Sequence, residues 1–240
     1  MDNSKQEGVI KYDRSQFIPA APLPVSEYHT LARWRKRLRD LGLIGVYPDG
    51  VGYGNLSCRK DYSNIFSSSH PQFLITGSQT GHLEELTGEH FSRVLDFDIP
   101  AMKVLSMGVV EASSETLTHA AIYQANPRIT AVAHGHHRRL WQRMIELNYP
   151  STSDSLAYGT DLLARAVGEI ARDRNEGLLV MKGHMDGMIC FASSFDKLGV
   201  MLDATMKCLV EELSARRNDN LTKNSDLLAK DVKSSPPTLA

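Results

Sequence analysis

Residues 131–136 read AVAHGH, a short apolar run that ends in two histidines with one glycine between them. The run predicts a buried strand over residues 129–134, because small and β-branched apolar residues pack well in a sheet. Side chains two positions apart on a strand point to the same face, so His134 and His136 would converge on one point. Two neutral imidazoles on one face suit zinc or another first-row metal ion. The pair alone is weak evidence, since most such pairs are surface or core histidines.

Two further histidines lie near this pair in different settings. His137 follows directly and, by the same alternation, points the other way, so we expect it at the surface where a helix starts. His184 lies in KGHMDG at residues 182–187, between two strand-like runs and beside glycines that allow a turn. Because a catalytic metal keeps three protein ligands and one open position, His184 is the candidate third ligand.

The sequence around these histidines predicts strands and helices in irregular order. Strands are expected over residues 45–47, 54–58, 73–76, 129–134, 178–181 and 188–191. Helices are expected over residues 26–41, 113–126, 137–147, 160–174 and 194–217. This order lacks the regular alternation of a doubly wound fold. We therefore expect an α/β protein of the α+β type, with a mainly antiparallel central sheet flanked by helices.

The two ends of the chain differ in composition from its middle. Residues 1–24 are polar and then proline-rich, which indicates an extended N-terminal arm. Residues 25–217 form the predicted domain. Residues 218–240 are charged and contain serine and proline, and we expect a mobile C-terminal tail.

A second candidate site is the stretch ASSE at residues 112–115. Ser113 and Ser114 can cap a helix whose first turn holds Glu115, which is the simpler interpretation. The functional alternative is that hydroxyl and N–H groups at a helix start hold an anion such as phosphate, beside a carboxylate that moves protons. His119 lies four residues further along the same helix face, where it could orient Glu115.

Two segments combine glycine with short polar side chains, residues 52–57 and residues 76–81. Such segments can form backbone nests for anions, but ordinary loops have the same composition. Neither segment is specific for a ligand.

The charge of the chain excludes some classes of partner. The chain has 240 residues, of which 42% are apolar and 23% charged, as in a globular protein with a sizeable core. Its formal net charge of −1 gives no reason to expect nucleic acid or a membrane surface as a partner. The one strongly basic run, residues 33–39, is interpreted as the solvated face of an early helix rather than as a nucleic-acid patch.

Cysteine usage and hydropathy predict the compartment. Cys58, Cys190 and Cys208 have apolar neighbours and no metal-binding or redox spacing, so we expect buried thiols in a reducing compartment. No segment approaches the ~20 apolar residues of a membrane span. A cytoplasmic protein is expected.

Taken in order, five motifs resemble the class II aldolase/adducin family over about residues 26–212: GNLS, LIT-x-x-x-TG, SSE-x-x-x-H, AVAHxH and a late histidine beside glycines. That family includes fuculose-1-phosphate aldolase and ribulose-5-phosphate 4-epimerase. The resemblance implies a three-layer α/β/α fold, with zinc bound by three histidines on an antiparallel sheet. It also implies a fourfold-symmetric homotetramer with sites between subunits.

By position, the resemblance implies a role for each motif residue. The metal ligands are His134, His136 and His184. Glu115 is the catalytic acid/base. The substrate- and phosphate-binding residues are Asn55, Thr80, Gly81, Ser113 and Ser114. The implied function is that of a zinc-dependent lyase of carbohydrate metabolism, which cleaves or forms a C–C bond in a small, phosphorylated sugar through a metal-stabilised enediolate.

The chain departs from the family pattern in three places. The loop after residues 74–76 is longer, so Thr76 and Gly77 compete with Thr80 and Gly81 for the phosphate role. His184 is followed by Met-Asp-Gly, which makes Asp186 a rival ligand or an orienting group. No tyrosine corresponds to the catalytic tyrosine of the aldolases, because neither Tyr149 nor Tyr158 aligns with it.

Other functions fit the same residues. A metal-dependent epimerase, decarboxylase or dehydratase would use related chemistry, and a bound but unreactive metal could serve in ligand sensing. An adducin-like scaffold without activity is the alternative from another class. The three histidines with Glu115 argue against the scaffold, because adducin-type domains lack the full ligand set.

Overall fold

The computed structural model describes residues 8–211. The chain divides into two compact units, residues 1–200 and residues 201–240. Residues 195–200 are helical at the end of the first unit, and residues 201–211 are helical in the second. The last predicted helix therefore begins one residue after Ser194, while its predicted end at residue 217 and the predicted tail lie outside the described residues.

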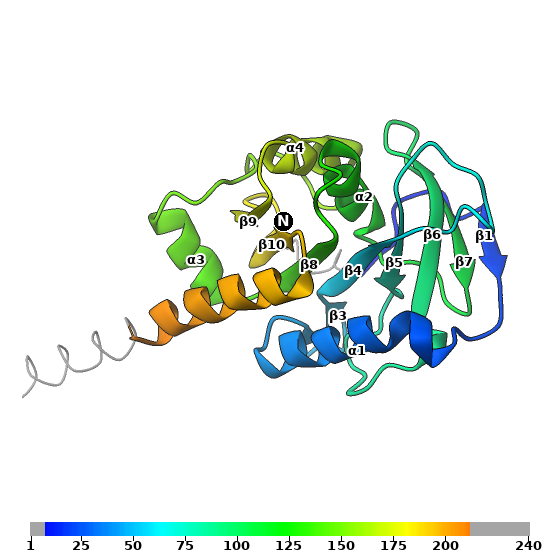
Figure 1. The fold of residues 1–240 in the computed structure, drawn as a ribbon. Coiled ribbons are helices and arrows are strands. Elements are labelled where there is room, and N and C mark those ends of the chain that lie inside the picture. Colours follow the sequence, from blue (N-terminus) through cyan, green and yellow to red (C-terminus); the bar gives the residue numbers. More distant parts are fainter. Residues whose placement is uncertain (1–7, 212–240) are drawn as a thin grey trace, which may run out of the picture. The chain divides into compact units, whose positions relative to one another are not determined.

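The first unit contains every named element of the fold (Figure 1). The strands are β1 (Phe17–Pro19), β2 (Gly45–Val46), β3 (Gly52–Tyr53), β4 (Asn55–Lys60), β5 (Gln72–Thr76), β6 (Phe91–Asp98), β7 (Lys103–Gly108), β8 (Ala131–His136), β9 (Glu176–Val180) and β10 (Gly187–Ala192). The helices are α1 (Val25–Asp40), the 3-10 turn η2 (Gly88–His90), α2 (Thr116–Ala125), α3 (Arg138–Glu146) and α4 (Asp161–Ala171).

Eight of the strands form one sheet in the order β1-β7-β6-β5-β4-β8-β10-β9. Every neighbouring pair is antiparallel except β1 with β7, which is parallel. Strands β2 and β3 form a separate two-stranded hairpin. The predicted fold class, a mainly antiparallel sheet flanked by helices, is confirmed.

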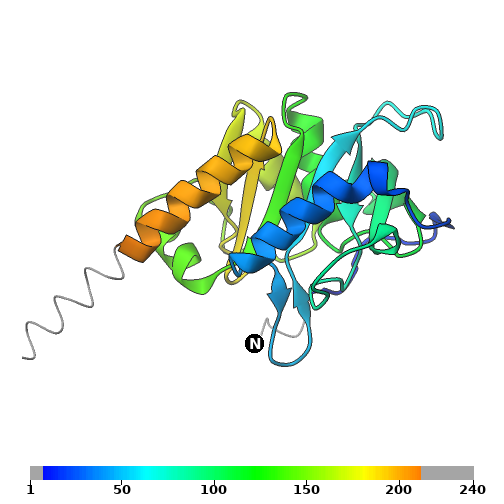
Figure 2. The same ribbon diagram turned by 60° about the horizontal axis from the view of Figure 1, so that its bottom comes forward.

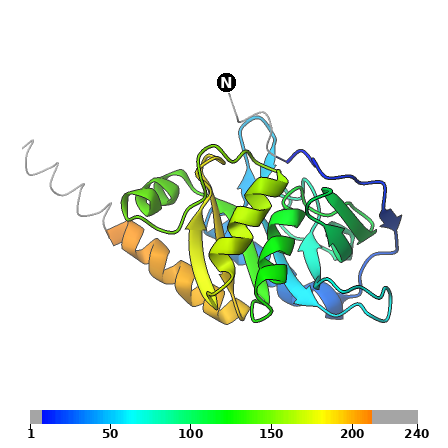
Figure 3. The same ribbon diagram turned by 90° about the horizontal axis from the view of Figure 1, so that it is seen from above.

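Helices cover both faces of the large sheet. Figure 2 shows α1 in front of the strands, and Figure 3, seen from the other side, shows α2 and α4 in front of them. Trp34 of α1 stacks on Phe195, with ring centroids 5.6 Å apart. Helices α2 and α4 approach closely, because a Cβ at Gly168 would lie only 3.0 Å from the Ala121 carbonyl oxygen. The arrangement has three layers.

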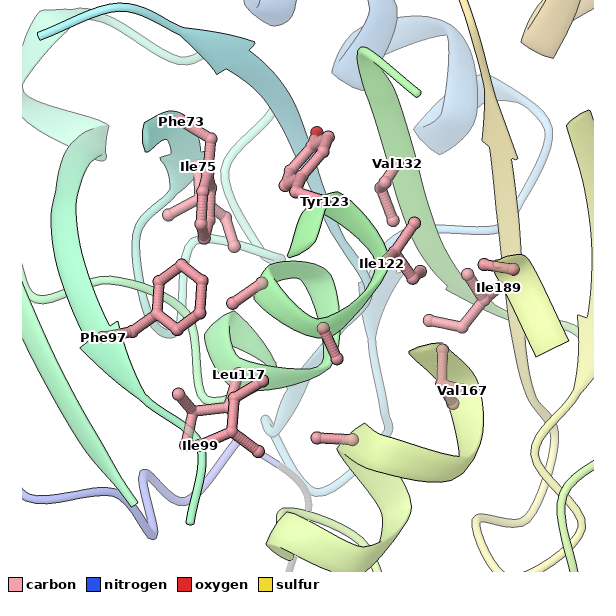
Figure 4. Close-up of a cluster of buried hydrophobic side chains, with 14 of the residues drawn as sticks. Phe73, Ile75, Phe97, Ile99, Leu117, Ile122, Tyr123, Val132, Val167 and Ile189 are labelled. Atoms are coloured by element: carbon pink, nitrogen blue, oxygen red, sulfur yellow. The ribbon is translucent and has the colours of Figure 1, made fainter. Parts of the chain in front are cut away.

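The main core lies between the sheet and the α2–α4 layer (Figure 4). Phe73, Val132 and Ile189 contribute side chains from β5, β8 and β10, and Ile122 and Val167 contribute theirs from α2 and α4. All five are fully buried. This face of the sheet is therefore apolar along β8 as far as Val132, and the histidines of β8 follow on the same face.

Most predicted elements exist, with ends shifted by one to three residues. Strands β1, β3, β6 and β7 were not predicted. The pairing of β6 with β7 shifts register between Val94 and Asp96, so Val94 and Leu95 are both buried and the alternation of apolar and polar residues is broken. A pattern search with period two therefore fails on β6.

The N-terminal segment runs along the edge of the sheet. Asp13 N–H donates to the Met102 carbonyl at 2.7 Å, and β1 pairs with β7. Tyr12 is buried, and its hydroxyl donates to the Ala112 carbonyl at 2.7 Å. The predicted boundaries after residues 24 and 217 stay predictions.

The cysteines and the helices bear on the predicted compartment. The three cysteines are free thiols; Cys190 is buried and Cys58 half-buried, but Cys208 is exposed. The expectation was wrong for Cys208, because neighbours in sequence lie on different faces of a helix. No helix among residues 8–211 combines the length and apolar character needed to cross a membrane.

Phe73→Ala should lower the free energy of unfolding by about 3–5 kcal/mol, because the ring is fully buried and its removal leaves a cavity. The ring lies against Tyr123, with centroids 5.0 Å apart. Leu162→Ala on α4 is the control, since Leu162 is 60% exposed and should cost less than about 0.5 kcal/mol. Urea unfolding of both variants measures the difference, and equal losses would contradict this assignment of the core.

Candidate metal centre

Three histidines from two parts of the chain meet at one end of the sheet. His134 and His136 lie at the end of β8, and His184 lies in the turn between β9 and β10. One ligand nitrogen of each lies within 4.8 Å of the others. The ring centroids are 4.7 to 5.0 Å apart, and the side chains are 0%, 4% and 6% exposed. The spacing of this buried group fits one metal ion held by three imidazoles.

The pairing of β8 fixes the two neighbouring histidines. His134 lies opposite Ile189 and His136 opposite Gly187, so β10 holds both in register. Gly135 faces the other way, and a Cβ there would lie 3.0 Å from the Leu43 carbonyl oxygen and 3.1 Å from the Leu43 Cβ. Leu43 also accepts a hydrogen bond from the N–H of His136 at 2.9 Å. Glycine at position 135 therefore lets the segment after α1 pack directly on the histidine strand.

A tight turn aims His184 at this pair. A Cβ on Gly183 would lie 2.1 Å from the Leu156 carbonyl oxygen, so this position accepts only glycine without rearrangement. The His184 N–H donates to the Met181 carbonyl at 3.0 Å, which closes the turn. Asp186 has φ +65°, and its carboxylate lies 3.4 Å from the Arg138 side chain. The three-histidine group does not include Asp186.

The Nδ1 atoms of the β8 histidines are held by other side chains. The Tyr47 hydroxyl lies 2.7 Å from Nδ1 of His136, and the Asn55 side-chain nitrogen lies 3.3 Å from Nδ1 of His134. A histidine that binds a metal through Nε2 carries its proton on Nδ1 and donates it to a neighbour. Asn55 can serve this purpose, because its Oδ1 is buried without a hydrogen bond within residues 8–211 and a turn of the amide brings that oxygen to Nδ1.

Burial keeps His134 neutral. Its pKa lies well below the usual 6.5, because burial disfavours the charged imidazolium and the nearby His136 and His184 add repulsion. Its Nε2 is buried and makes no hydrogen bond within the described residues. A histidine can bind a metal only when it is neutral and one ring nitrogen is available, and His134 meets both conditions. The donor set and this nitrogen therefore fit a divalent ion.

Glu115 lies beside the three histidines. Its side chain is buried, and Oε1 lies 4.0 Å from Nδ1 of His184. Helix α2 begins at Thr116 with Glu115 as its N-cap residue, and no side chain caps it. The serines are thus not the N-cap residue that the simpler interpretation expected, although the Ser113 hydroxyl accepts the Glu115 N–H at 3.4 Å. Both serines are buried, and the Ser114 hydroxyl makes no hydrogen bond within residues 8–211.

His119 does not orient Glu115 as expected. Its Nδ1 lies 2.7 Å from the Ser57 hydroxyl, which also lies 2.8 Å from the Tyr123 hydroxyl. His119 is fully buried, which lowers its pKa to about 3, and its Nε2 makes no hydrogen bond within the described part of the chain. The residue is a neutral histidine at physiological pH.

The predicted phosphate-binding residues lie on loops that run side by side. Gly77 bridges to Ala112, and the Ser78 N–H donates to the Glu111 carbonyl at 2.9 Å. This brings the loop with Thr80 and Gly81 next to the segment that leads into Ser113 and Ser114. The Thr80 hydroxyl donates to the Gly77 carbonyl at 3.0 Å. Asn55 lies opposite His134 on the neighbouring strand β4.

Thr76 already makes a side-chain hydrogen bond to the backbone of the neighbouring strand. Its hydroxyl accepts a hydrogen bond from the Leu56 N–H at 3.2 Å, which ties β5 to β4. The competition between Thr76–Gly77 and Thr80–Gly81 for the phosphate role stays open, because no ligand distinguishes the two pairs.

Sequence reasoning missed two residues around this centre. Tyr47 contacts His136 from 89 positions away, and no local pattern indicates that contact. Arg35 belongs to the basic run expected on a solvated helix face, but it is only 1% exposed. Its spacing could have revealed this, since Leu31, Trp34, Arg35 and Leu38 form the buried stripe of α1 at i, i+3, i+4 and i+7.

Tyr158 also borders the centre. Its ring centroid lies 4.7 Å from that of His184, and its hydroxyl donates to the Val9 carbonyl at 3.3 Å. Lys11 donates to the Tyr158 carbonyl at 2.7 Å. The N-terminal segment is therefore attached to the tyrosine that packs on His184.

Comparisons with known proteins identify the family and agree with the fold. The family model described as "Class II Aldolase and Adducin N-terminal domain" matches residues 49–208. A search of the curated proteins found no match. Among solved structures, a sugar-phosphate aldolase from Thermotoga maritima is 18% identical, with TM-score 0.56, covering 79% of this chain and 95% of that one. An L-fuculose-1-phosphate aldolase from Thermus thermophilus is 19% identical, with TM-score 0.55, covering 90% and 100%. At these identities the likeness concerns the fold.

The buried neutral His119 should make the metal-free protein less stable in acid. Between pH 3 and 6.5 the unfolded chain binds this proton and the folded chain does not, so stability falls as pH falls below 6.5. The expected contribution is a loss of about 2 kcal/mol between pH 7 and pH 5. Urea unfolding with a chelator present should show a shallower dependence for His119→Asn, which can keep the bond to Ser57.

The control for this pH dependence is His29→Asn, because His29 is exposed on α1 and should leave the wild-type slope unchanged. An unchanged slope in His119→Asn would contradict the assignment of His119 as a buried neutral group.

Proposed function

We propose that this chain, which belongs to the class II aldolase and adducin family, is a metal-dependent lyase that cleaves or forms a C–C bond in a small, phosphorylated sugar. The observation that carries this proposal is the buried group of three histidines with Glu115 at 4.0 Å from His184. A chain that served only as a scaffold would have no need for three buried imidazoles beside a buried carboxylate, since burying such groups is costly.

His134, His136 and His184 would hold the ion, and zinc is the proposed metal because imidazole nitrogen suits it. When bound, the ion would supply Lewis-acid stabilisation of negative charge that develops on the substrate oxygens. Tyr47 and Asn55 would orient two of the ligands by accepting the Nδ1 protons of His136 and His134.

Glu115 is proposed as the group that moves the proton. Its carboxylate is buried beside the ligands, so it can act on the carbon that gains or loses the C–C bond, in a site with little water. Backbone pairing at residues 111–112, shortly before Glu115, holds this segment against the loop at residues 77–78. The distance between Glu115 and the proposed phosphate-binding loop would therefore stay fixed during the reaction.

The substrate class rests on the predicted phosphate-binding residues, namely Asn55, Thr80, Gly81, Ser113 and Ser114. Two of the structural neighbours are a sugar-phosphate aldolase and an L-fuculose-1-phosphate aldolase, which supports a sugar phosphate without establishing one. A cytoplasmic homotetramer acting in carbohydrate metabolism is part of the same proposal. Epimerisation, decarboxylation or dehydration on a related sugar is the alternative for the same site.

Elemental analysis should find about one zinc or other first-row ion per chain in the wild type, since three imidazoles complete the protein side of a catalytic site. His134→Ala and His184→Ala should each lose it. His137→Ala is the matched control: its Nδ1 accepts the Leu140 N–H at 3.1 Å at the start of α3, so this variant should keep the ion and lose only about 1 kcal/mol of stability. Folded wild-type protein without metal, even after zinc is supplied, would favour the scaffold.

Glu115→Gln should retain the ion but lower turnover by about 10²–10⁴-fold, because the amide has similar shape and cannot exchange a proton. Retro-aldol cleavage of a panel of ketose phosphates, followed through the aldehyde released, measures the effect. The control is Glu111→Gln, a half-buried carboxylate paired with Arg14 at 3.1 Å, which should retain turnover. Unchanged turnover in Glu115→Gln would remove Glu115 from the mechanism.

A further inference from the structure

Arg35 is a buried arginine that binds backbone carbonyls. Its Nη2 donates to the Thr80 carbonyl at 2.8 Å and to the Gly81 carbonyl at 3.0 Å. Its Nη1 donates to the carbonyls of Leu83 and Glu84. One guanidinium on α1 therefore fixes four peptide groups of a single loop, which is the loop predicted to bind phosphate.

These bonds set the direction of the loop's N–H groups. In a trans peptide the carbonyl of one residue and the N–H of the next point in opposite directions. Since the Thr80 and Gly81 carbonyls point at Arg35, the N–H groups of Gly81 and His82 point away from it. Within residues 8–211, neither N–H donates a hydrogen bond. The loop thus turns two N–H donors away from the arginine: the Gly81 nitrogen lies against Gly52 of the β2–β3 hairpin, and His82 is exposed.

The positive charge of Arg35 has no carboxylate beside it. All its hydrogen-bond partners are neutral carbonyls, and no carboxylate of residues 8–211 contacts it. Burial and the nearby Arg39 lower its pKa to about 10, so the group stays charged at neutral pH. A buried charge is costly unless an opposite charge is near. A bound anion on the far side of the loop would supply that opposite charge.

The far side of the loop borders an open cavity. This cavity has a volume of about 530 Å³, and Gln79 and His82 of the loop line it together with Asp49–Gly52 of the β2–β3 hairpin and with Gly8 and Val9. The loop packs closely on this hairpin, since a Cβ on Gly81 would lie 2.2 Å from the Gly45 carbonyl oxygen. Tyr53 of the same hairpin lies 5.6 Å from His136, centroid to centroid, so the hairpin that lines the cavity also contacts the candidate metal centre.

We propose that Arg35 is a positioning residue for the substrate's phosphate group. It binds the carbonyl ends of the loop at residues 80–84, turns the N–H groups of Gly81 and His82 away from α1, with His82 at the wall of the cavity, and places a positive charge behind them. Arg35 does not touch the phosphate. This inference rests on the proposed function in that the phosphate belongs to the substrate, but phosphate binding can be measured without turnover.

The test uses the full-length chain after removal of metal with a chelator, so that inorganic phosphate cannot bind an ion at the histidines. Isothermal titration with inorganic phosphate at constant ionic strength gives the affinity, and circular dichroism checks the fold. Arg35→Met should bind phosphate at least about tenfold more weakly than the wild type, because it loses the charge and the fixed loop. Arg35→Lys should fall between the two, at about fivefold weaker, because an ammonium cannot hold two pairs of carbonyls.

Arg39→Met is the matched control. Arg39 also binds this loop, through the carbonyls of Gly81 at 3.3 Å, His82 at 3.0 Å and Leu83 at 2.6 Å, but it is half-buried and, unlike Arg35, makes no hydrogen bond to the carbonyls of Thr80 and Glu84. Its loss should change the phosphate affinity less than about twofold. An equal loss in Arg39→Met and Arg35→Met would show a general effect on loop stability and overturn the proposal.

Other outcomes are equally decisive. Should Arg35→Met fail to fold, Arg35→Lys carries the test, and wild-type affinity in that variant would overturn the proposal. A wild-type chain that binds no phosphate overturns it as well, while the metal content and the effect of Glu115→Gln still decide the proposed function separately.

Discussion

The register of β8 between β4 and β10 is the constraint on which the core and the metal centre both depend. Val132, His134 and His136 share one face of this strand, so the same alternation that buries Val132 under α2 turns both imidazoles inward. A slip by one residue would turn the histidines to the opposite face of the sheet, against Leu43, and put Gly135 in their place. The strand is held on both sides by antiparallel ladders, which makes such a slip costly. The pairing of β8 with β4 and β10 therefore determines both the packing of the core and the positions of His134 and His136.

Burial of polar groups is the second theme of the structure. The imidazoles, Glu115 and the Arg35 guanidinium are all withdrawn from water, where a charge without compensation is unfavourable. The structure meets this in two ways. Histidines stay neutral and bind neighbouring hydroxyl or amide groups, as His119 does with Ser57. Arg35 stays charged and donates hydrogen bonds to four backbone carbonyls of the loop, which stabilise its positive charge.

Much of the fold and the centre could be predicted from the sequence, because those features depend on local periodicity. Helix α1 lies within one residue of its predicted bounds, and α4 begins one residue after its predicted start at Thr160, whose hydroxyl accepts the Leu163 N–H at 3.2 Å. The rest depends on contacts across the chain: the bulge in β6, the pairing of β1 with β7, and Tyr47 on His136 leave no local pattern. Arg35 was missed because its residue type was given more weight than its position on the apolar stripe.

The capping of α3 by His137 has a consequence for how the proposed metal would bind during folding. Three histidines stand within four residues of one another in an unfolded chain, at positions 134, 136 and 137, whereas His184 is far away along the sequence. An ion captured early would bind that local cluster, since unfolded histidines also bind metals. In the folded chain, the Leu140 N–H donates a hydrogen bond to Nδ1 of His137. The pairing of β8 with β10 brings His184 close to His134 and His136. The helix start would thus separate His137 from the three proposed ligands, and loading of the proposed metal would follow assembly of β8 with β10.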